Sequence, residues 1–139
     1  MNELSFFDTN IIIYADDEAV LEKQARARAL WVEHRRLNTA VISVQVLQEY
    51  FATVTRKLRM PADIALAKVK LLVRARVVSF HEQDVVAAIE LHRLARISFW
   101  DALIVQAARI GGAKVLYSED MQHGSTIGGV RIVNPFLPS

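Results

Sequence analysis

Residues 4–10 read Leu-Ser-Phe-Phe-Asp-Thr-Asn, and this stretch decides how the rest of the chain is interpreted. A short apolar run is followed at once by an acidic residue, Asp8. Such a run, bounded by polar residues, predicts a buried strand. Ligands of open α/β sheets bind beyond the carboxyl ends of the strands. Asp8 is therefore the first candidate for chemistry.

Beyond this stretch, short apolar runs alternate with segments of helical spacing. We expect further strands at 39–42, 77–80, 115–117 and 130–133, and helices at 19–31, 44–58, 61 to about 76, 82–95 and 99–110. Pro61 suits a first helical turn, and Gly111-Gly112 suit a left-handed cap after the last helix. The alternation predicts a three-layer α/β sandwich, with a mostly parallel sheet and helices on both faces. With 139 residues and no linker, we expect a single domain, 1–139.

Composition narrows the class of protein. The chain is 53% hydrophobic and 23% charged, as soluble proteins are. Its apolar runs fall far short of the roughly 20 residues that span a bilayer. The first residues lack a positive n-region, so we expect no secretory signal and no membrane partner. Without cysteine there can be no disulfide or thiolate metal site, which fits a reducing, cytoplasmic location.

The charge balance gives a weaker indication of a polyanionic partner. The formal net charge is +2 and the sequence pI is about 9.2. Basic residues cluster at 56–59, at Arg74 and Arg76, and at Arg93 and Arg96. These clusters either follow a phosphate backbone or form solvated helix faces, and composition alone favours the second.

Four carboxylates share one end of the expected sheet. They follow a strand directly or belong to a nearby helix: Asp8, Glu49, Asp101 and Asp120. Carboxylates in one small volume repel each other, and a bound divalent cation removes that conflict. An all-oxygen set of ligands suits Mg²⁺ or Mn²⁺. The pattern therefore predicts a metal site.

Two of these residues have a structural alternative at the start of a helix. Asp8, or Thr9 beside it, could simply be the N-cap of the next segment. Asp101 follows Ser98 at the spacing of a capping box, although Glu or Gln is the usual partner there.

The other two could be ordinary surface residues. Glu49 lies opposite an expected apolar stripe, which favours a solvated side chain. The stripe consists of Val44, Leu47, Phe51, Val54 and Leu58. Asp120 could be a turn residue, because the segment 118–124 is loop-like. What favours the functional interpretation is the shared location of all four.

The same residues carry a resemblance to a known family. The chain resembles the PIN-domain nucleases, and within them the VapC-type toxins of toxin–antitoxin pairs, over segments 7–15, 43–51, 98–104, 115–121 and 129–136. The resemblance implies a PIN-like fold and cleavage of RNA phosphodiester bonds by one or two carboxylate-bound Mg²⁺ ions, with Mn²⁺ as a substitute. It also implies an antitoxin protein as partner, and homodimers are common in the family.

The resemblance extends to the neighbours of the four carboxylates. It implies that Thr9, Asn10 and Ser118 orient carboxylates or phosphate oxygens, although they could equally satisfy local backbone groups. One acidic residue that many relatives carry after the fourth motif is missing here. Glu119 could replace it or point away, and His123 could approach a phosphate or be solvated.

Two other functions remain open at this point. One is a PIN-like module without activity that binds RNA or serves as a scaffold, against which the intact acidic positions argue. The other is a phosphatase with an aspartate nucleophile, which usually needs a second Asp where this chain has Asn10. An antitoxin would place an amphipathic segment in an apolar groove, with candidate lining residues on the helices 19–31 and 47–58.

Overall fold

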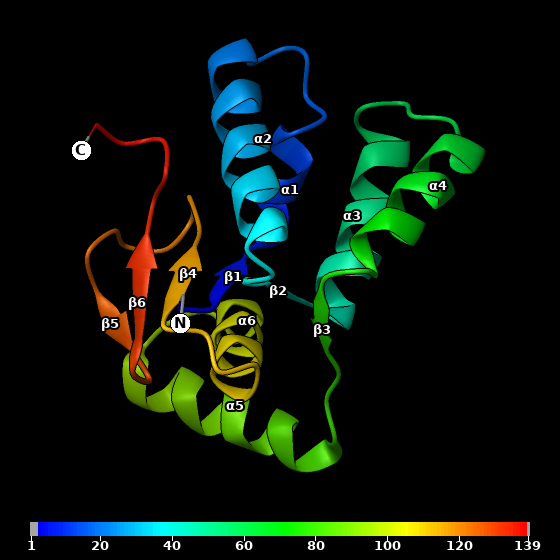
Figure 1. The fold of residues 1–139 in the computed structure, drawn as a ribbon. Coiled ribbons are helices and arrows are strands. Elements are labelled where there is room, and N and C mark those ends of the chain that lie inside the picture. The colour runs from blue at the N-terminus through cyan, green and yellow to red at the C-terminus, as the bar shows by residue number, and fades with distance from the viewer. Residues whose placement is uncertain (1–2, 139) are drawn as a thin grey trace.

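A six-stranded sheet forms the centre of the computed structural model, which describes residues 3–138 (Figure 1). The strands are β1 (Ser5–Phe7), β2 (Ala40–Ser43), β3 (Arg76–Val78), β4 (Val115–Tyr117), β5 (Thr126–Ile127) and β6 (Val130–Val133). Their order across the sheet is β3-β2-β1-β4-β6-β5. Only the β5–β6 pair is antiparallel, so the prediction of a mostly parallel sheet is confirmed.

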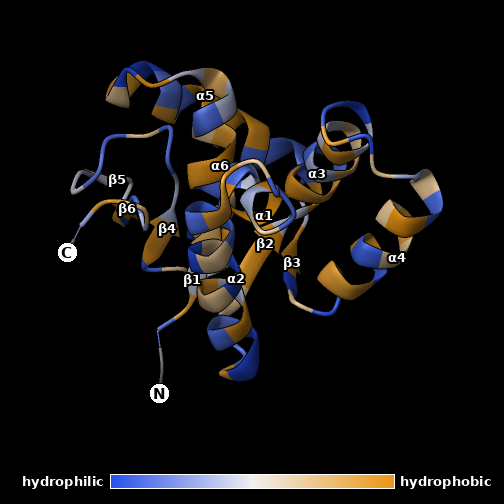
Figure 2. Cartoon of the chain, turned by 90° about the horizontal axis from the view of Figure 1, so that it is seen from above, coloured by the Kyte–Doolittle hydropathy of each residue, from blue (hydrophilic) through white to orange (hydrophobic). Residues whose placement is uncertain are grey.

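Six helices surround this sheet in the described part of the chain. They are α1 (Thr9–Tyr14), α2 (Leu21–Arg36), α3 (Val44–Arg56), α4 (Ala62–Leu72), α5 (Glu82–Ala95) and α6 (Phe99–Ile110). Helix α6 packs against β2, β4 and β6, and α5 packs on its outer side. Helix α2 lies on the opposite face of the sheet (Figure 2). The predicted three-layer arrangement is therefore confirmed.

The core explains the apolar runs of the sequence. Phe6 and Phe7 of the central strand are fully buried, one on each face of the sheet, and each contributes about 2 kcal/mol by burial. Helix α6 is buried along 102–108, because the sheet lies on one side of it and α5 on the other. The start of α6 is therefore held firmly at the edge where the strands end.

The end of α6 is seated closely against the sheet. A Cβ on Gly111 would lie 2.7 Å from Cγ1 of Val41 and 2.9 Å from Cγ2 of Val78. Gly111 has a φ of −73°, so it is needed for close approach and not for a left-handed turn. The left-handed residue is Gly112, with a φ of +75°, so the predicted cap is right for one glycine of the pair.

Several boundaries differ from those that the sequence predicts. The short helix α1 and the two-residue strand β5 were not predicted. Helix α2 starts later and ends later than 19–31, α4 ends at Leu72, and β3 covers 76–78 instead of 77–80. Within residues 3–138, no helix has both the length and the apolar character needed to cross a membrane.

The expected apolar stripe of α3 is confirmed only in part: Val54 is buried and Leu47 and Leu58 pack against the core. The residues of this helix that are buried are Val46, Tyr50 and Val54. Val44 and Phe51 of the expected stripe are instead 40% and 38% exposed. The helix carries apolar residues on more than one side, and its packing against β2, α1 and α4 selects which side is covered. This rotation moves Glu49 from the solvent side to the flank of the buried face.

Candidate active site

Asp8 lies where β1 ends and α1 begins. One carboxylate oxygen, Oδ1, accepts a hydrogen bond from the backbone N–H of Thr9 at 2.7 Å, and the other, Oδ2, accepts one from Ser118 Oγ at 2.8 Å. Asp8 is the N-cap residue of α1, as one sequence interpretation expected. The same side chain is only 7% exposed, which is unusual for an acidic residue that serves only as a cap.

The environment of Asp8 disfavours its charged form. Burial raises its pKa to about 7, against the opposing effect of the hydrogen bonds from Ser118 and Thr9. The negative charges of Asp120 and Asp101 raise it further. A nearby cation would stabilise the charged form of this carboxyl group.

Glu49 reaches the same region from α3. Its Oε1 accepts a hydrogen bond from Thr9 Oγ1 at 2.7 Å, and the side chain is half-buried. Four residues spaced four apart line one side of the site: Gln45, Glu49, Thr53 and Lys57. Glu49 is therefore not the solvated surface residue that the expected stripe implied.

Asp101 and Asp120 complete the group of carboxylates. Asp101 lies in the first turn of α6, and its backbone N–H donates to Ser98 Oγ at 3.0 Å. Burial raises the pKa of Asp101 against the hydrogen bond with Ser98, and the charges of Asp120 and Glu49 raise it further. Asp120 Oδ2 accepts from Asn10 Nδ2 at 2.8 Å.

All four carboxylates line one cleft of about 410 Å³. They come from the end of β1, from α3, from α6 and from the loop after β4. Lys57 is the cationic side chain that lines this cleft with them, and sequence analysis did not single it out by itself. Asp101 and Asp120 also line an adjoining hollow of about 640 Å³, where the cationic side chain is that of Arg96.

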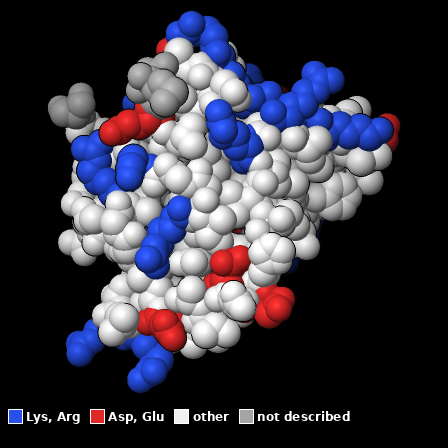
Figure 3. Space-filling model, turned by 60° about the horizontal axis from the view of Figure 1, so that its bottom comes forward, with Lys and Arg blue, Asp and Glu red and all other residues white. Residues whose placement is uncertain are grey.

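Figure 3 shows blue side chains gathered along the upper right edge of the face that it draws, while the middle of this face is largely neutral. The members of the basic clusters found in the sequence take different positions in the structure. Lys57 and Arg96 line the two adjoining hollows, and Arg76 donates from Nε to the backbone carbonyl of Asn38 at 3.1 Å.

The atoms that could ligate a metal in the cleft suit a hard cation. They are oxygen atoms, and Oδ1 of Asn10 is buried without a hydrogen-bond partner. Thr9 donates a hydrogen bond to Glu49, and Asn10 donates one to Asp120. Within residues 3–138, no three His, Cys, Asp or Glu side chains are grouped closely enough to hold a metal ion. The chemistry of the donors fits Mg²⁺, and the carboxylates share the cleft without forming a closed set of ligands.

Ser118 links the carboxylate of Asp8 to the backbone of the loop that carries Asp120. It is fully buried, donates to Asp8 and accepts the backbone N–H of Asp120 at 3.2 Å and that of Met121 at 3.4 Å. The three neighbours that the sequence marked, Thr9, Asn10 and Ser118, each contact one of the four carboxylates. They do so through side-chain hydrogen bonds.

Glu119 and His123 have partners outside the cleft. Glu119 accepts from the Tyr14 hydroxyl at 2.6 Å and forms an ion pair with Lys23. Burial raises its pKa, but the hydrogen bonds from Lys23 and Tyr14 outweigh this and hold the pKa below its usual value. His123 Nδ1 accepts the backbone N–H of Asn134 at 2.9 Å. Glu119 therefore points away from the carboxylates, one of the two possibilities that the sequence left open.

Comparisons with known proteins bear on the family and the fold. A family model for the PIN domain matches residues 5–125. The fold is similar to that of Mycobacterium tuberculosis VapC20, described as a sarcin–ricin loop cleaving toxin, at 24% identity and a TM-score of 0.67, covering 84% of this chain and 89% of that one. Comparison with curated proteins gives no match.

Two further solved structures share the fold. A toxin–antitoxin complex from Klebsiella pneumoniae is 15% identical, with a TM-score of 0.66, and the alignment covers 95% of this chain and 98% of that one. DNA-bound VapBC from Salmonella typhimurium is 20% identical, with a TM-score of 0.67, and the alignment covers 94% and 97% of the two chains. At these identities the likeness concerns the fold.

Proposed function

The chain belongs to the PIN domain family, and from this premise we propose that it is a metal-dependent endoribonuclease, the toxin of a toxin–antitoxin pair. Its substrate is RNA, its cofactor is Mg²⁺, with Mn²⁺ as a substitute, and its active site is formed by Asp8, Glu49, Asp101 and Asp120. The observation that carries the proposal is that these four carboxylates, from four separate elements, line one cleft.

The residues of the cleft have distinct parts in this proposal. The four carboxylates would hold the cation, which when bound lowers the pKa of a water molecule and neutralises charge on the phosphate. Ser118 and Thr9 keep Asp8 and Glu49 oriented through their hydrogen bonds. Lys57 lies at the cleft as a counter-charge for the phosphate backbone of the RNA.

An antitoxin partner is the second element of the proposal. Two of the structures with this fold are described as a toxin–antitoxin complex and as VapBC bound to DNA. An apolar cleft of about 290 Å³ offers a seat for a partner segment, with Ile12, Trp31 and Leu71 among its lining residues. It lies between α1, α2, α3 and α4, which includes both helices that the sequence suggested.

The proposal further includes a single domain, a homodimer and a cytoplasmic location. Limited proteolysis checks the first, light scattering after size-exclusion chromatography the second, and cell fractionation the third. A monomer in solution would remove the dimer from the proposal without affecting the active site.

Cleavage of RNA by the purified protein tests the function. We expect EDTA to abolish cleavage of total RNA and Mg²⁺ or Mn²⁺ to restore it, while a small phosphomonoester stays intact. Full cleavage in the chelator would refute the metal site. RNA binding without cleavage under all metal conditions would instead favour a binding module or scaffold, and hydrolysis of the phosphomonoester would favour a phosphatase.

A further inference from the structure

One turn of α1 contacts two consecutive acidic residues of the loop after β4. Asn10 donates to Asp120 at 2.8 Å and Tyr14 donates to Glu119 at 2.6 Å. Residues four apart lie on the same side of a helix, so a single face of α1 contacts both carboxylates. One of these faces the cleft, and the other does not.

The contact at Glu119 extends to α2 and to the C-terminal segment. Lys23 pairs with Glu119, and its ammonium group lies 4.8 Å from the centre of the Tyr14 ring and 5.4 Å from that of Phe136. Tyr14 and Phe136 are themselves in edge-to-face contact, with ring centres 5.1 Å apart. We call these four residues, Tyr14, Lys23, Glu119 and Phe136, the clasp.

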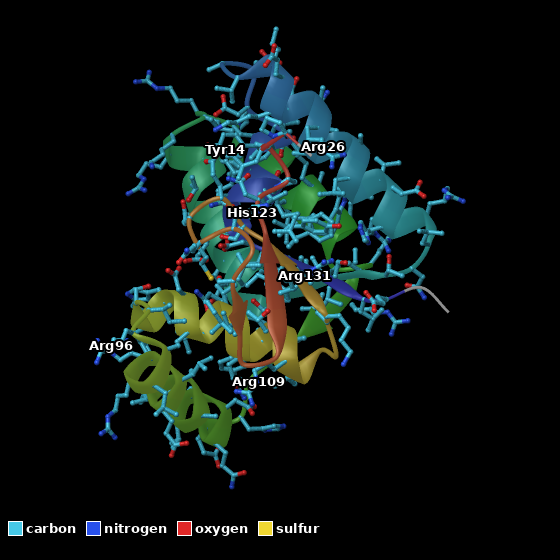
Figure 4. All side chains as sticks on the ribbon, turned by 90° about the vertical axis from the view of Figure 1, so that its left-hand side faces the viewer. Tyr14, Arg26, Arg96, Arg109, His123 and Arg131 are labelled. Carbon is cyan, nitrogen blue, oxygen red and sulfur yellow. The ribbon has the colours of Figure 1, made fainter. Side chains whose placement is uncertain are left out.

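Two further hydrogen bonds hold the C-terminal segment just before Phe136. Arg26 of α2 donates from Nε to the backbone carbonyl of Pro135 at 3.1 Å. The backbone N–H of Asn134 donates to His123, at the far end of the loop that carries Asp120. Figure 4 shows Tyr14, Arg26 and His123 near one another, around the end of β6. The loop is thus tied to the rest of the protein on both sides of Asp120.

The ion pair of the clasp differs from an ordinary surface pair on the same helix. The side chains of Lys23 and Glu119 are 36% and 24% exposed, whereas those of Arg36 and Glu33 are 66% and 53% exposed. The clasp also joins residues 96 positions apart in the chain, and the surface pair joins neighbours. Of these two pairs, only the one in the clasp can therefore fix one element against another.

We propose that Lys23 and Glu119 are positioning residues, which hold the loop after β4 so that Asp120 faces the carboxylate cleft. Glu119 then acts on the site indirectly, because its contacts with Lys23 and Tyr14 lie outside the cleft and hold the loop in place. The effect on the metal rests on the proposed function. The effect on the loop does not.

Two variants and a matched control pair test this proposal. Lys23→Met removes the cation but keeps an apolar stem, and Glu119→Gln removes the charge but keeps the shape. Arg36→Met and Glu33→Gln make the same changes in the exposed pair of α2, and Lys23→Arg retains the charge of the clasp. Melting curves in EDTA first establish that each variant folds.

Two measurements then decide. The first is hydrogen–deuterium exchange of the peptide 118–125 in metal-free protein, and the second is the Mg²⁺ concentration that gives half of the maximal shift in melting temperature. We expect faster exchange in both clasp variants and a rise of about tenfold in the Mg²⁺ required. The control variants and Lys23→Arg should behave as the wild type does.

Unchanged loop exchange and unchanged Mg²⁺ requirement in folded clasp variants would overturn the proposal, as would equal effects in the control pair. A wild-type protein that neither cleaves RNA nor responds to Mg²⁺ would refute the proposed function. Loop exchange would then decide the role of the clasp by itself, with faster exchange supporting it and unchanged exchange refuting it.

Discussion

Replacing Asp8 by Asn should make the metal-free protein more stable at alkaline pH, although Asp8 caps α1. The amide can keep one of the two hydrogen bonds, because its oxygen accepts from the backbone N–H of Thr9 as the carboxylate does. Its NH₂ group cannot accept the hydrogen bond that Ser118 Oγ donates to Asp8, so that bond is lost. The substitution therefore removes a disfavoured charge at a cost of about 1 kcal/mol for one hydrogen bond, and that cost does not depend on the charge of Asp8.

The pKa of Asp8 sets the magnitude and the sign of this effect. In the folded protein it is raised from 3.8 to about 7, so ionisation destabilises the fold increasingly as the pH rises through that window. The full shift corresponds to about 4 kcal/mol, reached above the folded pKa. At about pH 5 only about 1.5 kcal/mol of this is present, since the folded side chain is still protonated there. The stability gained by the variant should thus grow by about 2.5 kcal/mol between about pH 5 and about pH 8.

Thermal melts of both proteins in EDTA measure this difference. A change of 2.5 kcal/mol corresponds to a shift on the order of 8 °C for a chain of this size. Added Mg²⁺ should stabilise the wild type and have little effect on the variant. A variant that is less stable than the wild type by the same amount at both pH values would refute the reasoning, because it would show that the carboxylate acts only as a helix cap.

Three other substitutions probe the cleft. Glu49→Gln should reduce RNA cleavage by orders of magnitude and leave the free energy of unfolding within about 0.5 kcal/mol of the wild type. The exposed control Glu90→Gln should change stability as little and keep its activity. Equal activity of the two variants would remove Glu49 from the site. Thr9→Val, which removes one hydrogen bond to Glu49, should cost about 1 kcal/mol of stability and raise the Mg²⁺ requirement about tenfold, and an unchanged requirement would count against an orienting role. Lys57→Met should weaken RNA binding and reduce its salt slope by about 1, whereas an unchanged slope would place the phosphate backbone elsewhere.

The location of the candidate site could be predicted because parallel strands end at one edge of a sheet. Asp8 and Asp120 follow adjacent strands, β1 and β4, whose register pairs Phe7 with Tyr117. If these two strands are parallel and adjacent, their carboxylates can converge, and the structure supplies that adjacency. Asp101 follows from the same logic, because Ser98 fixes the start of α6 at that edge.

The position of Glu49 required information that the apolar pattern does not contain. Two apolar rows on α3 compete, and only the tertiary contacts select the row of Val46, Tyr50 and Val54. The polar row of Gln45, Glu49 and Thr53 was visible in the sequence and would have indicated the cleft side. Helix α1 escaped prediction for another reason: six residues with three consecutive isoleucines are too few to distinguish a helical period from a strand.

The close contact of Gly111 with the sheet couples the two ends of α6. The helix is rigid and buried, its far end rests on Val41 and Val78, and its near end carries Asp101 ten residues away, about 15 Å along the axis. A methyl group added at Gly111 would lie too close to Val41 and Val78, so these side chains or the end of α6 would have to shift. A shift of the helix would displace Asp101 at its other end, while every residue of the cleft kept its identity and its charge. On the proposed function, RNA cleavage would then fall although the substituted position makes no contact with the carboxylates.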